Sequence, residues 1–219
     1  MRDATLAAIA FALAEHARTG FETDPERLGH LLGVRFIPGT EARASNGPPS
    51  IVTLPKDAYA PRQRFTTHHE LGHILVQRSG LEDDIRAEVS EEDSEAHLEL
   101  VVNFIAALLV MPQPLVRAIH DEHGDTPQSI LALAQAARVS LPAAMHRWVS
   151  HDLGACRAAF LTSGSYISHI ATCNAWLPFW RYDRVPELET CLPDVRMATA
   201  PNRLSLRVGV TQGEPYYYS

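Results

Sequence analysis

The sequence predicts an α+β protein that is mostly helical, with a small β-sheet, a helix-turn-helix-like helical segment and a short C-terminal β-rich region. Two observations predict this class. Apolar residues recur with helical period over most of the chain up to about residue 150, interrupted by two short β-branched runs. Beyond residue 153 the helical period fades and strand-like runs replace it. We expect three parts, which are residues 1–124, 125–152 and 153–219.

The bulk composition narrows the class of protein. The 219 residues are 46% hydrophobic and 21% charged, which is ordinary for a folded globular chain. A formal net charge of −7 argues against a protein that binds nucleic acid through bulk positive charge. Cys156, Cys173 and Cys191 lie far apart without C-x-x-C spacing, which favours a reducing compartment over a disulfide framework.

The N-terminal half predicts helices around a small sheet. The apolar segment 4–14 resembles a secretion signal, but its helical period continues to about Phe21 and its start carries no net positive charge. We therefore expect an amphipathic helix rather than an export signal. Asp24-Pro25 is a typical start for the next short helix, residues 26–32. The runs 34–38 and 50–54 are strand-like, and the turn-rich stretch between them predicts a hairpin or small sheet.

The remaining elements follow in order. A helix is expected from Pro61 to about Arg78, and the acidic stretch after it is expected to be a solvated loop. The further predicted elements are helices over 93–110, 127–137 and 141–150, and strands over 158–162 and 204–210.

The run His69-Glu70-Leu71-Gly72-His73 carries the strongest chemical signal. In a helix, residues four apart lie on one face, so His69 and His73 can direct imidazole nitrogens at one metal ion. Glu70 then lies beside that ion, where a general base can take a proton from a metal-activated water. Gly72 removes a side chain next to the site, so another backbone or a substrate can approach closely. The pattern indicates a metal-dependent peptidase.

A catalytic zinc site uses three protein ligands and one open position. No third histidine follows His73 closely, and the next long helix offers Glu95 and Glu99 one turn apart on one face. Spacing alone does not separate the two. Asn103, one turn beyond Glu99, can hydrogen-bond a ligand, and this favours Glu99.

Other polar residues near the motif have less definite roles. His68 points about 100° away from His69 around the helix, so we expect it to support a ligand or lie at the surface. During peptide hydrolysis, negative charge develops on the oxygen of the attacked carbonyl and needs a hydrogen-bond donor. Tyr59 and His97 are candidates for this donor.

Two stretches of the chain resemble a known family. Residues 62–73, RQRFTTHHELGH, are similar to the active-site helix of ImmA/IrrE-type metallopeptidases, in which a phrase like QRFTLAHELGH recurs. Residues 99–112, ELVVNFIAALLVMP, resemble the family pattern E-x-x-x-N-x-x-A-A-x-x-L-M-P. With the helical segment after them, the resemblance spans roughly residues 60 to 150. It implies a zincin-like domain with His69, His73 and Glu99 as metal ligands and Glu70 as the catalytic glutamate. The expected ion is Zn²⁺, with Mn²⁺ and Fe²⁺ as alternatives.

The resemblance also implies a biological role. Members are typically cytoplasmic, gluzincin-like peptidases that cleave, or trigger the loss of, a partner repressor of the Xre/helix-turn-helix type. Stress-response, mobile-element or prophage genes are thereby released. Some members carry a GAF-like sensor domain after the peptidase, but the region after Ser150 looks short for one.

Two other functions stay open. One alternative is a metal-containing regulatory protein that binds a repressor or DNA without proteolysis, and a weaker one is a secreted zinc protease. In the helix-turn-helix-like segment the second helix offers few base-reading side chains besides Arg147. We therefore expect a structural or partner-docking role there rather than direct nucleic-acid binding, and we expect no membrane partner.

Overall fold

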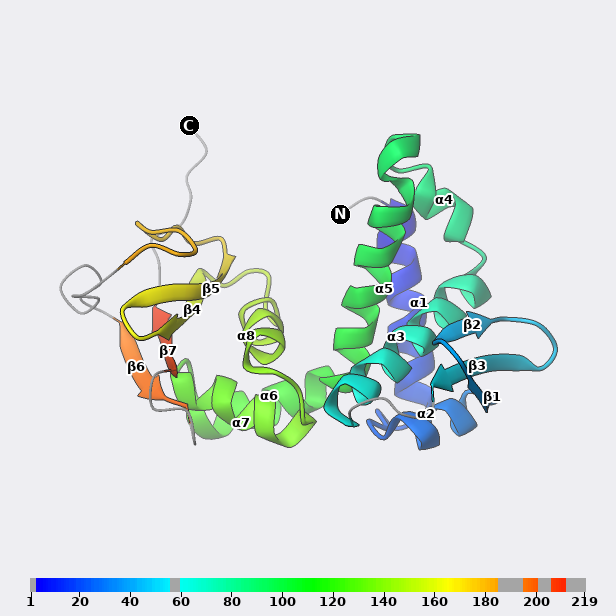
Figure 1. Cartoon of the computed structure of the whole chain (residues 1–219), viewed down its shortest axis with the longest axis horizontal. Coiled ribbons are helices and arrows are strands. Elements are labelled where there is room, and N and C mark those ends of the chain that lie inside the picture. Colours follow the sequence, from blue (N-terminus) through cyan, green and yellow to red (C-terminus); the bar gives the residue numbers. More distant parts are fainter. Residues whose placement is uncertain (1–2, 56–59, 185–194, 201–205, 212–219) are drawn as a thin grey trace. The chain divides into compact units, whose positions relative to one another are not determined.

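The computed structural model describes residues 3–55, 60–184, 195–200 and 206–211. Its internal contacts divide the chain into two compact units, Met1–Pro112 and Gln113–Ser219 (Figure 1). This division falls earlier than the boundary expected after residue 124, and the three-part organisation stays a prediction. The predicted α+β class is confirmed, since the described helices are accompanied by two small sheets.

The first unit contains most of the helical sequence. Its helices are α1 (Asp3–Arg18), α2 (Pro25–Leu31), α3 (Ala60–Ser79), α4 (Glu82–Arg86), the 3-10 helix η1 (Glu91–Asp93) and α5 (Ser94–Val110). Its strands are β1 (Val34–Gly39), β2 (Arg43–Ser45) and β3 (Ser50–Pro55). The second unit contains α6 (Gln113–His123), α7 (Pro127–Ala137), α8 (Leu141–Val149), β4 (Arg157–Ser163), β5 (Tyr166–Cys173), β6 (Arg196–Thr199) and β7 (Leu206–Thr211).

Helices α1, α3 and α5 pack side by side and form the core of the first unit (Figure 1). Each contributes a buried apolar stripe with helical period. The stripes consist of Ala8, Ile9 and Ala12 on α1, of Leu71, Ile74 and Leu75 on α3, and of Val102, Ile105 and Leu109 on α5. Burying one such aliphatic side chain stabilises the fold by about 1.5–3 kcal/mol. The amphipathic helix expected at the N-terminus is therefore a core helix.

Of the two expected arrangements, a hairpin or a small sheet, the first unit contains the small sheet. Strands β1 and β3 pair in parallel, with Val34 opposite Ser50, and β2 pairs antiparallel to β3. The strand order is β1-β3-β2, so β2 forms an edge, and it lies against α3. The turn-rich stretch between β1 and β3 contains a third strand, β2. Short apolar runs carry no information on strand direction, so they did not predict the parallel pairing.

The acidic connection is not a plain solvated loop. Residues Glu82–Arg86 form α4, whose Ile85 is fully buried. Arg86 links this helix to α5, because its Nε lies 3.3 Å from Glu95 Oε2. Glu88, whose side chain is only 9% exposed, anchors α1 by accepting hydrogen bonds from Thr5 N at 3.0 Å and Thr5 Oγ1 at 2.6 Å.

Replacing Glu88 with glutamine is expected to destabilise the chain in a pH-dependent way. Burial acts to raise the pKa of Glu88, but hydrogen bonds from Thr5 and His97 outweigh it and lower this pKa to about 2. A carboxylate with a lowered pKa stabilises the fold above its ordinary pKa, near ~4.3, and this contribution is lost as the pH falls toward 2. We expect a loss of about 1–2 kcal/mol at pH 7 that shrinks below pH ~4. Urea unfolding of the wild type and of Glu88→Gln at pH 7 and below pH ~4 tests this. An equal difference in unfolding free energy at the two pH values would contradict it.

The second unit combines the predicted helix pair with a four-stranded sheet. Helices α7 and α8 are joined through Arg138, which adopts a left-handed conformation with φ of 54°. The sheet has the order β5-β4-β7-β6 with antiparallel neighbours. On α8, Arg147 is only 4% exposed and its NH2 donates to Gln113 Oε1 at 2.8 Å. This cation therefore supports the unit internally instead of facing a ligand such as DNA.

Cys156 and Cys173 are half-buried, and Cys156 Sγ lies 3.1 Å from Asn174 O, whereas Cys191 lies outside the described residues. In the part of the chain that the structure describes, no single helix is long and apolar enough to cross a membrane, although residues 91–110 and 113–123 reach that length and composition as a bent pair.

Candidate metal centre

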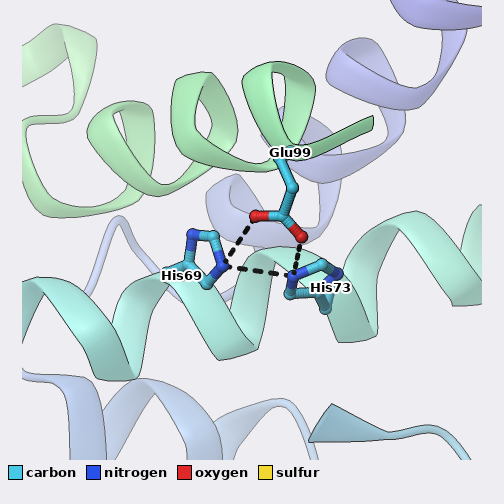
Figure 2. Close-up of side chains that lie close together, drawn as sticks. All are labelled: His69, His73 and Glu99. Carbon is cyan, nitrogen blue, oxygen red and sulfur yellow. Dashed lines mark hydrogen bonds and ion pairs between the residues drawn. The ribbon is translucent and has the colours of Figure 1, made fainter. Parts of the chain in front are cut away.

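Helix α3 places the two motif histidines on one face. Since His69 and His73 are one turn apart on a continuous helix, their rings lie close, with centroids 4.8 Å apart. Their Nε2 atoms are separated by 3.1 Å. Figure 2 shows both rings directed toward the facing helix, α5.

Glu99 on α5 completes a three-residue cluster (Figure 2). Its Oε2 lies 3.3 Å from His69 Nε2, and its Oε1 lies 3.3 Å from His73 Nε2. We call these three residues the His-His-Glu cluster. The other candidate, Glu95, is 68% exposed and pairs with Arg86 instead. The structure therefore brings Glu99, and not Glu95, to the histidines.

The chemistry of the donor atoms fits a divalent cation. His69 Nδ1 lies 3.0 Å from Asn103 Oδ1, which can only accept, so Nδ1 carries the proton of the neutral ring. The Nε2 lone pair of His69 then faces His73 and the Glu99 carboxylate. Acceptor atoms this close repel one another unless a proton or a cation lies between them. Zinc bonds of about 2.0–2.1 Å make tetrahedral ligand edges of about 3.3–3.4 Å, close to the spacing in the cluster.

Gly72 allows α3 and α5 to approach closely. A Cβ at this position would lie 3.2 Å from both the Cγ1 atom and the carbonyl oxygen of Val102 on α5. The carbonyl belongs to a helical backbone and cannot rotate away. The close approach suggested by the sequence is therefore made by the backbone of α5, and it holds Glu99 across from the histidines.

Replacing Gly72 with leucine is expected to lower both stability and metal affinity. A larger side chain must push α5 away from α3, at a cost of about 1–3 kcal/mol for overpacking. Urea unfolding and zinc competition with a chelator measure the two effects. Gly47 serves as the control position. A Cβ added there would lie 3.9 Å from its nearest neighbour, Pro49 O, which is an ordinary van der Waals distance. Equal stability of Gly72→Leu and Gly47→Leu would contradict the close-packing argument.

Glu70 lies beside the cluster in a mostly buried position, 6% exposed. Burial raises the pKa of the Glu70 carboxyl, and the Glu99 carboxylate raises it further. A hydrogen bond from the backbone of Ala44, on the edge strand β2, acts in the opposite direction and lowers this pKa. Glu70 is therefore a carboxylate of increased basicity that a neighbouring strand holds in place.

The histidines of the region have distinct environments. Burial lowers the pKa of His73, and the neighbouring His69 lowers it further, which favours the neutral ring that a metal requires. His68 is fully buried with Nδ1 2.8 Å from Arg64 O, and burial lowers its pKa to about 4. His68 is thus a neutral core residue, so a surface position was a wrong expectation.

Of the two candidate oxyanion donors, His97 has another partner in the structure. His97 Nε2 lies 3.1 Å from Glu88 Oε2, so this side chain belongs to the α1 anchor. Tyr59 lies outside the described residues. Sequence reasoning missed the Ala44 contact, because a backbone N–H leaves no signal in residue type.

Asn103 is expected to support metal binding through His69. Because its Oδ1 fixes the orientation and tautomer of the ring, Asn103→Leu should weaken zinc binding about 10–100-fold. Asn103→Asp keeps an acceptor and should retain most of the affinity. Chelator competition measures both variants, and zinc binding by Asn103→Leu at wild-type affinity would exclude this role.

Comparison with known proteins places the cluster in a family. The family model described as the IrrE N-terminal-like domain, of the M78 peptidases, matches residues 31–149. The radiation response metalloprotease IrrE of Deinococcus radiodurans is 31% identical over 117 residues, 52% of this chain and 36% of the relative. The protein of that name from Deinococcus deserti is also 31% identical over 117 residues, 52% of this chain and 42% of the relative. The chain thus covers less than half the length of these curated relatives.

A solved structure resembles the chain in fold. It is a Mycobacterium tuberculosis transcriptional regulator with a TM-score of 0.57 and 16% identity, covering 93% of this chain and 74% of that one. At this identity the likeness shows the fold alone. The family match covers more than half of the chain and includes His69, His73 and Glu99. The chain therefore belongs to the IrrE N-terminal-like family of M78 peptidases.

Proposed function

We propose that the chain is a zinc-dependent endopeptidase, with His69, His73 and Glu99 as the metal ligands and Glu70 as the general base. The convergence of three potential ligand side chains carries this proposal, since the two Nε2 atoms lie 3.1 Å apart and each lies 3.3 Å from one Glu99 carboxylate oxygen. Membership of a peptidase family and the buried position of Glu70 support it. Mn²⁺ and Fe²⁺ remain alternatives to Zn²⁺, because two imidazoles and a carboxylate suit each of these ions.

In this mechanism His69, His73 and Glu99 would hold the ion, which would supply Lewis acidity to the attacking water and the scissile carbonyl. Glu70 accepts a proton from the attacking water and passes it to the leaving amine. Its raised pKa makes the carboxylate a stronger base, and the Ala44 backbone N–H restrains it. Asn103 orients the His69 ring and keeps its Nε2 lone pair directed at the ion.

The proposed substrate is a protein partner, a helix-turn-helix repressor of the Xre type, cut in the cytoplasm. Its loss would release stress-response, mobile-element or phage-related genes. The relatives support this indirectly, since their names join a metalloprotease to a radiation response.

Co-expression tests the proposed function. The chain is expressed with the repressor encoded beside its gene, and in parallel as Glu70→Gln, and the repressor is examined by mass spectrometry. We expect a defined cut with the wild-type chain and none with Glu70→Gln. If the repressor is bound but stays intact with both chains, or is cut equally by both, the peptidase proposal fails. The first of these outcomes supports a regulatory protein that binds the repressor without proteolysis.

A further inference from the structure

The second unit contains a cavity that the proposed peptidase chemistry does not use. Its volume is about 860 Å³, and its lining comes from α6, α7, the start of α8, β4 and β5. This lies within the ~300–1,000 Å³ range of small-molecule sites. The cavity is far from the motif in sequence, since its described lining begins at His123 and belongs entirely to the second unit.

One wall of the cavity is a stripe along α7. Gln128, Leu131, Ala132 and Gln135 follow the i, i+3, i+4, i+7 spacing of a single helix face. Leu131 and Ala132 are half-buried, and the exposed amides of Gln128 and Gln135 lie before and after them. The wall therefore offers a short apolar surface bounded by polar groups.

A β-bulge builds the opposite wall. Leu161 pairs with His169, but Thr162 pairs with Ile167, so Ser168 is an extra residue on β5. Successive residues of a regular strand point to opposite faces, yet Ser168 and His169 both line the cavity. A bulge re-aims side chains in this way and is common beside functional sites. The irregularity thus brings two polar side chains to one place.

The bulge also sets the hydrogen-bonding character of His169. The Ser168 hydroxyl donates to Leu161 O at 3.1 Å, so Ser168 Oγ accepts from His169 Nδ1 at 3.2 Å. Burial lowers the pKa of His169, and the Arg181 guanidinium and the His146 side chain lower it further. The ring is therefore neutral near pH 7. Among the described residues nothing hydrogen-bonds Nε2, which remains an acceptor.

The charge of the lining selects against ionic ligands. None of the described lining residues is Asp, Glu, Lys or Arg, and the ionisable ones are His123 and His169. A charged molecule would lose its hydration here without gaining an ionic partner among the described lining residues. An uncharged molecule loses much less.

From this geometry we infer that the second unit binds a small, uncharged, amphipathic molecule. Its apolar body lies on Leu131 and Ala132, and its hydroxyl or amide donor meets His169 Nε2. The cavity volume fits a small molecule, the stripe on α7 fits its apolar body, and the bulge on β5 supplies the acceptor for its donor group. The cavity belongs to the second unit and the His-His-Glu cluster to the first, and the inference does not depend on the peptidase proposal.

Calorimetric titration of the whole chain with 2-naphthol tests the site. This probe joins an apolar body to one hydroxyl donor, whereas 2-methoxynaphthalene lacks the donor and naphthalene-2-carboxylate adds a charge. We expect one saturable site for 2-naphthol, with each of the other two bound about tenfold more weakly. His169→Phe removes the acceptor and should bring 2-naphthol and 2-methoxynaphthalene to nearly equal affinity.

Two matched variants locate the binding. Ala132→Trp fills the apolar wall and should abolish binding of 2-naphthol, while Ala136→Trp adds the same group at an exposed position outside the lining and should leave it unchanged. Thermal unfolding checks that each variant folds. If Ala132→Trp does not fold, the comparison of 2-naphthol with 2-methoxynaphthalene on His169→Phe still tests the site. The inference is overturned by an absence of saturable binding, by equal binding of the carboxylate, or by binding that survives Ala132→Trp.

Discussion

Exchanging Glu70 for glutamine is expected to lower peptide hydrolysis by about 10²–10⁴-fold while the metal stays bound. Glutamine matches the size and shape of glutamate but cannot take a proton from water. Glu70 is 6% exposed, so bulk water has little access to the position from which its carboxylate acts. Because Glu70 lies outside the His-His-Glu cluster, the donor atoms of the cluster should be undisturbed.

Cleavage rates of the repressor at equal metal loading, together with metal content per chain, measure this effect. Glu70→Asp is the informative control, because it keeps the base but withdraws it from the site by one methylene. We expect Glu70→Asp to retain more activity than Glu70→Gln. Hydrolysis by Glu70→Gln at the wild-type rate would rule out Glu70 as the base.

Removing the Glu99 carboxylate is expected to abolish both metal retention and hydrolysis. Glu99→Ala leaves two histidine ligands where a catalytic zinc site needs three, so the loss of affinity should exceed the ~10–100-fold expected for Asn103→Leu. The same result is expected when a strong chelator strips the wild-type chain, and added zinc should restore activity only to the wild type.

Glu95 provides a matched control for Glu99. It lies one turn earlier on the same helix, but it is 68% exposed and pairs with Arg86. Glu95→Ala should therefore keep both metal and activity, with at most a small loss of stability. If Glu95→Ala loses the metal and Glu99→Ala keeps it, the ligand assignment is wrong.

The sequence predicts the placement of His69 and His73 on α3 well. It predicts the contribution of α5 to the site only in part. His69 and His73 come together because helical period alone places them on one face. Glu95 and Glu99 share that period, so only the packing of α5 on α3 separates them. The role suggested for Asn103 agrees with its contact to His69 Nδ1. The Ala44 contact follows from the placement of an edge strand, which local sequence does not encode.

Other parts of the fold escaped prediction for identifiable reasons. Helix α6 begins among the prolines at 112 and 114, which read locally as a break. Strands β1 and β3 pair in parallel, a choice set by the connection between them and not by their residues. The bulge at Ser168 arises from the register between β4 and β5, so periodicity within β5 does not reveal it.

The origin of the three donor atoms has a consequence for folding. They come from two helices, α3 and α5, and none comes from a loop. An ion held between them would act as a removable cross-link, closing the acidic segment between His73 and Glu99 into a ring as a disulfide would. Metal binding and the folding of the helical core would then be thermodynamically coupled. Loss of the ion would therefore lower the stability of the packing between α3 and α5 as well as the hydrolytic activity.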